Sequence, residues 1–196
     1  MIAGAVLLAA LGWAFTFGCP WGNFWIKIGL SVVLVVLYSL AWQRPRLRFS
    51  PASVLMGAAS AVVLYGIFRA GDALAPFVVP GAAAHVGGIY GLGEGSPRVW
   101  IALLLLFVTG PGEEIFWRGF LQDRLAARLG AWRGYGLATA IYAAVHVFSL
   151  NPMLILAALV AGAYWGLFYL WKRDLAALIV SHSLWSAVIF TVAPIG

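Results

Sequence analysis

Residues 98–122 read RVWIALLLLFVTGPGEEIFWRGFLQ, a long apolar run interrupted by only a few charges. A helix rises ~1.5 Å per residue and needs about 17–25 mainly apolar residues to cross the roughly 30 Å hydrocarbon core of a bilayer. This stretch is therefore long enough to cross a membrane as a helix. It predicts a fold built from transmembrane helices.

The composition of the whole chain agrees with that prediction. Of 196 residues, 64% are hydrophobic and 9% are charged, whereas a soluble domain carries roughly 25% charged residues. So few charges cannot cover the surface of a water-soluble protein of this size. A water-soluble fold is excluded, and an all-α polytopic membrane bundle is expected. The one cysteine, Cys19, excludes an intramolecular disulfide and a cysteine-based zinc cluster.

Seven apolar runs are long enough to be membrane spans, and we expect them to form a single membrane domain over residues 1–196. The first run has neither the basic start nor the small-residue cleavage pattern of a signal peptide, so a retained helix is expected there. Prolines stand near three of the starts, where a helix tolerates them. The runs cover about 2–18, 24–42, 52–69, 98–122, 134–150, 152–171 and 175–194.

Lys and Arg alternate between the loops that join these runs. Eight follow the second, fourth and sixth runs, and three lie on the opposite side. Because cytoplasmic loops of membrane proteins are enriched in Lys and Arg, this bias predicts a cytoplasmic N-terminus and an external C-terminus. The net charge of +6 is thus interpreted as a topology signal, and no nucleic-acid partner is expected. The eight are Arg44, Arg46, Arg48, Arg124, Arg128, Arg133, Lys172 and Arg173, and the three are Lys27, Arg69 and Arg98.

Residues 70–97 form the one long segment without a clear span, and they are rich in Gly and Pro. We expect the segment to lie outside the membrane core. Two interpretations stay open: a re-entrant or interfacial lid over a cavity, and a plain loop lying on the headgroups.

Five ionisable residues lie within the predicted spans: Glu113, Glu114, Arg118, His146 and His182. A charge at the centre of a bilayer costs at least ~2.5–3.5 kcal/mol, so each of these side chains is expected to face the protein interior. Glu114 and Arg118 are spaced i, i+4, which favours an ion pair along one helix. Glu113 lies about 100° further round that helix and has no local counter-ion, which makes it a candidate general base.

The depths of these residues agree with one shared site. Counted from the basic end of each span at ~1.5 Å per residue, Glu113 lies about 16 Å deep, His146 about 20 Å and His182 about 12 Å. Three different helices thus bring acids and imidazoles into one layer.

One carboxylate and two imidazoles suit two versions of hydrolysis. In the metal-free version, Glu113 takes a proton from a water that His146 also holds, and His182 hydrogen-bonds the developing oxyanion. In the zinc version, Glu113, His146 and His182 bind the metal, although their spacing is not H-E-x-x-H. Ser186, one turn after His182, is either a second oxyanion donor or a small residue for close packing, and the Tyr142 hydroxyl is expected to turn towards the site.

Two other classes of function also accommodate buried Glu and His residues. A polytopic proton-coupled transporter places such residues at the midplane, although the two matching halves with broken helices that such proteins show are not found here. A non-catalytic binding or immunity protein could keep the constellation for ligand binding alone.

Three short motifs resemble those of the CPBP (ABI) family of intramembrane proteases, which includes type II CAAX prenyl endopeptidases and proteins of bacteriocin processing or self-immunity. Residues 113–118, EEIFWR, are similar to E-E-x-x-x-R. Residues 142–146, YAAVH, are similar to F-x-x-x-H, and residues 182–186, HSLWS, to H-x-x-x-N or H-x-x-x-D. The order and placement match over about 98–195, which would be the catalytic core.

The resemblance implies a glutamate-dependent endopeptidase that cleaves within or next to a membrane. It implies that Glu113 is the general base, that His146 binds the water, and that His182 and the residue at 186 stabilise the oxyanion. Glu114 and Arg118 would support them. Two positions depart from the family pattern: Tyr142 replaces Phe, and Ser186 replaces Asn or Asp with a shorter side chain.

The resemblance also guides the expected substrate and location. Bacterial relatives are associated with maturing or clearing membrane-bound peptides, and the Ala-, Gly- and Arg-rich composition without terminal extensions is typical of prokaryotic proteins. We expect an integral protein of a prokaryotic inner or plasma membrane. Its expected partners are the bilayer and a membrane-anchored peptide or C-terminal protein tail, and a metal-free mechanism without a cofactor is favoured over zinc.

Overall fold

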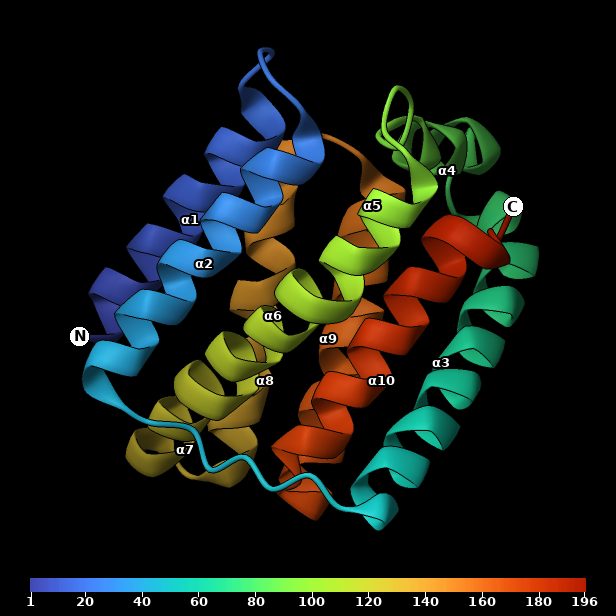
Figure 1. Cartoon of the computed structure of the whole chain (residues 1–196). Coiled ribbons are helices and arrows are strands. Elements are labelled where there is room, and N and C mark those ends of the chain that lie inside the picture. Colours follow the sequence, from blue (N-terminus) through green and yellow to red (C-terminus); the bar gives the residue numbers. More distant parts are fainter.

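The computed structural model describes residues 1–196, and all its regular structure is helical (Figure 1). The predicted all-α fold is confirmed. Three π-helical turns and one 3₁₀ turn interrupt or end the longer helices: η1 (Leu105–Thr109), η2 (Trp117–Gln122), η4 (Val188–Val192) and η3 (His146–Ser149). The helices are α1 (Ile2–Gly18), α2 (Phe24–Trp42), α3 (Pro51–Val78), α4 (Ala82–Gly91), α5 (Arg98–Leu104), α6 (Gly110–Phe116), α7 (Asp123–Leu129), α8 (Ala131–Val145), α9 (Pro152–Lys172) and α10 (Leu175–Ala187).

Five helical stretches are long and apolar enough to cross a membrane: α2, α3, Arg98–Leu129, α9 and Leu175–Val192. The chain is an integral membrane protein with several spans. By length and apolar composition only these five stretches qualify as spans, so the predicted count of seven spans is not confirmed. The run 2–18 forms α1, an apolar helix of 17 residues. The run 134–150 forms the 15-residue α8, because the chain tightens into η3 from His146 onward.

Polar side chains fix the starts of four helices close to the predicted boundaries. The side chains of Asn23, Ser50, Asn151 and Asp174 each accept hydrogen bonds from the first free backbone N–H groups of α2, α3, α9 and α10. Such a cap satisfies donors that the helix itself leaves unpaired. In a chain this apolar, these caps are the clearest local signal of where a helix begins.

The segment 70–97 is largely helical, so its interpretation as a plain loop was wrong. α3 continues nine residues beyond the predicted end at 69 and includes Pro76, and α4 follows after a turn at Gly81 with φ 70°. Exposed backbone polar groups are costly near a bilayer, so the apolar residues after position 69 favour helix despite their Gly and Pro content. α4 lies across one end of the bundle, where the side chain of Asn151 donates a hydrogen bond to the His85 carbonyl (2.8 Å).

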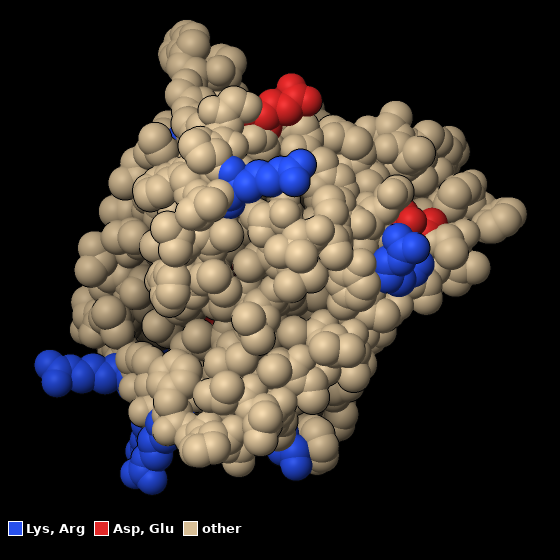
Figure 2. Space-filling model, turned by 45° about the vertical axis from the view of Figure 1, so that its right-hand side comes forward, with Lys and Arg blue, Asp and Glu red and all other residues tan.

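The two ends of the bundle differ in charge. At the end where α7 lies, here the α7 end, Arg124 donates to Gln43 Oε1 (2.6 Å) and Arg173 pairs with Asp123 (2.8 Å). At the opposite end, here the α4 end, α4 packs against α9, and Trp25 of α2 donates to the carbonyl of Leu92, the residue that follows α4 (3.0 Å). On the face shown in Figure 2, charged side chains gather towards the two ends and leave between them a band with almost no charged side chains.

α6 and η2 occupy the middle of the bundle, surrounded by α2, α8 and α10. Their side chains Phe116, Trp117, Phe120 and Leu121 are almost completely buried. The acidic residues of α6 are therefore placed in the protein interior, as the cost of a charge facing lipid requires.

Candidate active site

The two acids lie on α6, which packs closely against α10. A side chain at Gly110 would collide with Ser183 of α10, so glycine is needed for this close approach. Glu113 is 8% exposed and Glu114 is fully buried. The two adjacent carboxylates have different partners because successive residues of a helix point about 100° apart.

Glu114 is held in a buried network of charges. Its Oε1 accepts hydrogen bonds from Arg118 (2.8 Å) and from Nδ1 of His182 (2.7 Å). Arg118 also donates to the Gly162 carbonyl (3.1 Å) and lies over the ring of Tyr142, 4.9 Å from its centroid. The predicted Glu114–Arg118 pair is present, and Glu114 additionally orients His182.

Glu113 has no ion-pair partner. Its Oε2 is buried without a hydrogen bond, as is Oε2 of Glu114, but of the two side chains only that of Glu113 lines a cavity. An unpartnered buried acceptor is rare, because leaving it unsatisfied costs ~1–3 kcal/mol. Such a group is free to bind a water or a substrate, so this geometry agrees with the sequence interpretation of Glu113.

His146 begins the 3₁₀ turn after α8, and both of its ring nitrogens have partners. Nδ1 donates to the Tyr142 carbonyl (2.7 Å), and Nε2 accepts from Nε1 of Trp13 (3.3 Å). This pattern defines the neutral ring with its proton on Nδ1. The contribution of Trp13 was missed in the sequence, because α1 carries no ionisable residue to draw attention to it.

His182 lies on α10 and stacks on a tryptophan of α9. The ring centroids of Trp165 and His182 are 3.9 Å apart, at an interplanar angle of 15°. Trp165 also donates to Ser181 Oγ (3.1 Å). It was missed as well, although a tryptophan in the middle of a span, away from the interfaces where this residue is usual, was a usable signal.

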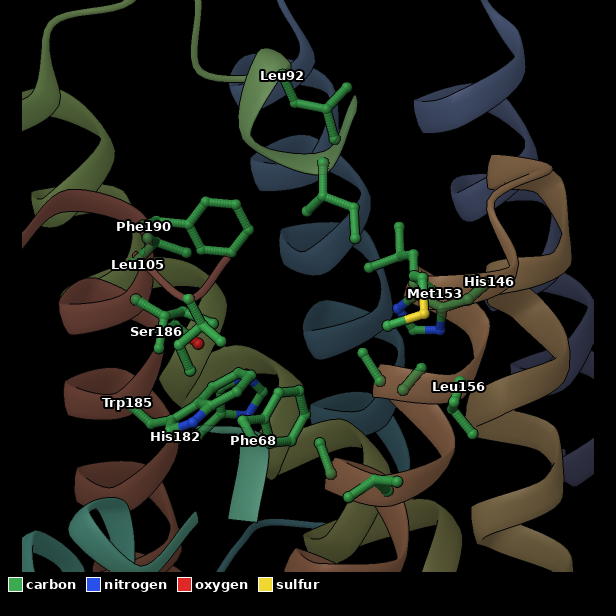
Figure 3. Close-up of a pocket in the computed structure, with 18 of the residues that line it drawn as sticks. Phe68, Leu92, Leu105, His146, Met153, Leu156, His182, Trp185, Ser186 and Phe190 are labelled. Carbon is green, nitrogen blue, oxygen red and sulfur yellow. The ribbon is translucent and has the colours of Figure 1, made fainter. Parts of the chain in front are cut away.

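Five of the seven predicted site residues share one cavity of about 290 Å³ with a mainly apolar lining. Figure 3 shows His182 and Ser186 on one wall and His146 on the opposite wall. Glu113 and Tyr142 also line the cavity, whereas Glu114 and Arg118 are outside its lining. The structure thus separates residues that face the cavity from residues that support them.

The residues do not form a zinc site in this arrangement. No three His, Cys, Asp or Glu side chains come together as a group able to hold a metal ion. His146 already uses both ring nitrogens, and His182 uses Nδ1 for Glu114. We therefore derive no step through a metal.

The fold and the site define an integral membrane protein of bundled helices, with a buried carboxylate and two imidazoles facing an apolar cavity. Residues 95–188 match the family model described as type II CAAX prenyl endopeptidase Rce1-like. The match covers nearly half of the chain, and the family to which this segment is similar is one of CAAX-type endopeptidases. No curated protein and no solved structure matches the chain.

The matched segment runs from just before α5 to the end of α10. It contains all three motifs noted in the sequence, and also Trp165. The helices α1 to α4 lie outside it, although Trp13 and part of the cavity wall come from them.

Proposed function

We propose that the chain is an intramembrane endopeptidase that hydrolyses peptide bonds of membrane-anchored peptides or C-terminal protein tails. The observation that carries the proposal is the carboxylate of Glu113, which has no ion pair and whose buried Oε2 has no hydrogen bond, in the same cavity as His146 and His182. The cavity is lined mainly by apolar side chains, which suits an apolar segment that enters from the bilayer.

The first step is the activation of water. Glu113 takes a proton from a water held between it and His146, and the water oxygen attacks the scissile carbonyl carbon. Nε2 of His146 is the ring nitrogen available to that water once Trp13 releases it, because the Tyr142 carbonyl keeps the other proton on Nδ1. The carbonyl electron pair moves onto its oxygen.

The second role is stabilisation of the resulting oxyanion. His182 donates through Nδ1 to Glu114, so its Nε2–H in the doubly protonated ring is the donor that remains for the oxyanion. Ser186 lies one turn further along α10 on the same cavity wall. Its hydroxyl, on a side chain shorter than Asn or Asp, supplies a second donor to the oxyanion. Glu114 and Arg118 hold His182 in place.

The last step, cleavage of the peptide bond, needs no further reactant. The tetrahedral intermediate collapses, the C–N bond breaks, and Glu113 returns its proton to the leaving amine. The products are a carboxylic acid and an amine, so one water is consumed for each bond. No cofactor takes part.

The location follows from the same proposal. The basic α7 end faces the cytoplasm, which places the N-terminus inside and the C-terminus outside, in an inner or plasma membrane of a prokaryote. The grouping of Arg124 and Arg173 at one end of the bundle supports this orientation.

The test is cleavage by the purified full chain in nanodiscs. A library of single-span peptides is incubated with wild type, Glu113→Gln, His146→Ala and the control Glu94→Gln, and the products are identified by mass spectrometry. Glu94 is exposed and does not line the cavity. We expect cleavage by wild type and Glu94→Gln only. Cleavage by Glu113→Gln at the wild-type rate, or intact peptides after binding to wild type, would contradict the proposal.

A further inference from the structure

The cavity lining carries one charged side chain outside the reacting centre, that of Asp72. The other acidic residue and the histidines of the lining are Glu113, His146 and His182, and most of the rest are apolar. Asp72 belongs to α3, which precedes the segment that matches the family model. A carboxylate in an otherwise apolar wall is a strong recognition element, because few competing groups surround it.

Asp72 has no cationic partner within the protein. It takes part in none of the three ion pairs and in no side-chain hydrogen bond, although it is partly buried. Arg69, one turn before it on α3, is exposed and does not line the cavity. The neighbouring polar group from another element is the hydroxyl of Tyr90 on α4, which already accepts from the Ile195 N–H (2.8 Å). The carboxylate is therefore available to a ligand in the cavity.

The height of Asp72 above the reacting centre can be read from the packing of α3 on α10. Both helices begin at the α7 end, and Ser60 and Ser181 meet at 3.0 Å between their hydroxyl oxygens. Asp72 lies 12 residues beyond Ser60, and His182 lies one beyond Ser181. At ~1.5 Å per residue, Asp72 is about 16 Å nearer the α4 end than His182. An extended peptide at ~3.3 Å per residue covers that distance in about five residues.

We propose that Asp72 binds a Lys or Arg side chain of the substrate, about five residues from the scissile bond on the α4 side. This inference rests on the proposed function and specifies the substrate class: an apolar segment with a basic residue near the α4 end. A Lys or Arg stem lies along apolar surface while its charged end reaches a polar group, so the cavity wall and Asp72 together suit such a side chain.

The test measures binding, so that it is independent of cleavage. Single-span fluorescent peptides carry Lys, Gln or Glu at the proposed position, and they are titrated onto full-length Glu113→Gln in nanodiscs of zwitterionic lipid. We expect the Lys peptide to bind about fivefold more tightly than the Gln peptide, and the Glu peptide more weakly still. Adding Asp72→Asn should remove the preference, and adding Asp72→Lys should reverse it. Adding Glu94→Gln, which removes an exposed acid at the same end, should leave the preference intact.

Equal affinities for the three peptides, or a preference that survives Asp72→Asn, would overturn the inference. A preference lost equally on Glu94→Gln would also overturn it, because a general surface potential would then explain the binding. Cleavage by wild type is scored separately: peptides that bind with the Asp72-dependent preference but are never cleaved would refute the proposed peptidase and leave the recognition site standing.

Discussion

The indole of Trp13 donates a hydrogen bond to Nε2 of His146 across 3.3 Å, and so joins the first helix to the second sequence motif. Trp13 is 1% exposed and also packs edge-on against Trp117, with ring centroids 5.6 Å apart. In the proposed mechanism Nε2 of His146 binds the water, so this hydrogen bond is exchanged for one to water during catalysis. The N-terminal helix is thus part of the site, although it lies outside residues 95–188.

Trp13→Phe keeps an aromatic ring and removes the donor. We expect the turnover number kcat to stay at or rise above the wild-type value, by up to about fivefold, because one neutral hydrogen bond contributes ~1 kcal/mol. The proton stays on Nδ1 through the Tyr142 carbonyl. Steady-state cleavage of one single-span peptide measures the effect.

Trp21→Phe is the matched control, since Trp21 is 80% exposed in the loop between α1 and α2. A folded Trp13→Phe protein that loses most of its activity would show that His146 needs the indole during catalysis, which contradicts the exchange described above.

Glu113 and Glu114 should respond in opposite ways to the same substitution. Glu114→Gln leaves Arg118 buried without its counter-ion and should lower the free energy of unfolding by about 3–5 kcal/mol. Glu113→Gln removes a carboxylate whose Oε2 has no partner, so the midpoint of thermal unfolding should equal or exceed that of wild type while cleavage is lost. Thermal unfolding in detergent measures both. A Glu114→Gln protein as stable as wild type would refute the supporting role of Glu114.

The stack of Trp165 on His182 should affect kcat more than KM. Trp165→Phe keeps a ring over His182, and we expect it to stay close to wild type. Trp165→Leu removes the ring and should lower kcat by up to about tenfold, because an aromatic pair contributes ~0.5–1.5 kcal/mol. KM should change little, since the proposed role of His182 is to stabilise the transition state.

Trp132→Leu is the control, because Trp132 is 68% exposed. If Trp165→Leu lowered the unfolding temperature but left kcat of the folded protein unchanged, Trp165 would contribute to packing and not to catalysis.

The sequence revealed the ionisable part of the site and little of its surroundings. Glu113, Arg118 and His182 stand out because a charge or imidazole within an apolar run is costly, and the i, i+4 spacing of Glu114 and Arg118 is readable directly. Trp13 and Trp165 carry no such cost, because aromatic residues are ordinary in membrane helices. Only the position of Trp165 in the middle of a span, away from the interfaces, was a signal for it.

Asp72 was overlooked for a different reason. The Gly and Pro residues of 70–97 argued against helix, so the segment was placed outside the membrane core. In an apolar environment Gly- and Pro-containing segments can still favour helix, because backbone N–H and C=O groups that cannot bond to water must bond to each other within the helix. Helix α3 therefore continues past position 69 and carries Asp72 to the cavity wall.

The packing of α3 on α10 can be tested with two glycines of one helix. A side chain at Gly57 would collide with the Ala177 carbonyl and with Val180, whereas nothing lies within 4 Å of the same position at Gly66. We expect Gly57→Val to lower the free energy of unfolding by about 1–3 kcal/mol and to reduce activity, because α3 forms part of the cavity wall. Gly66→Val should behave as wild type. Equal effects at both positions would mean that α3 is not held against α10 as described.

Chelation distinguishes the two versions of the chemistry. His146 has both ring nitrogens engaged, and His182 has only Nε2 left after binding Glu114. A zinc ion would therefore need Trp13 to withdraw and Glu113 to move before three ligands could meet. We expect the rate of peptide cleavage to be unchanged by 1,10-phenanthroline or EDTA, under conditions in which a zinc protease in the same buffer is inhibited. Loss of activity on chelation, restored by Zn²⁺ and abolished in His146→Ala, would show that this rearrangement occurs and would assign the water to a metal rather than to Glu113.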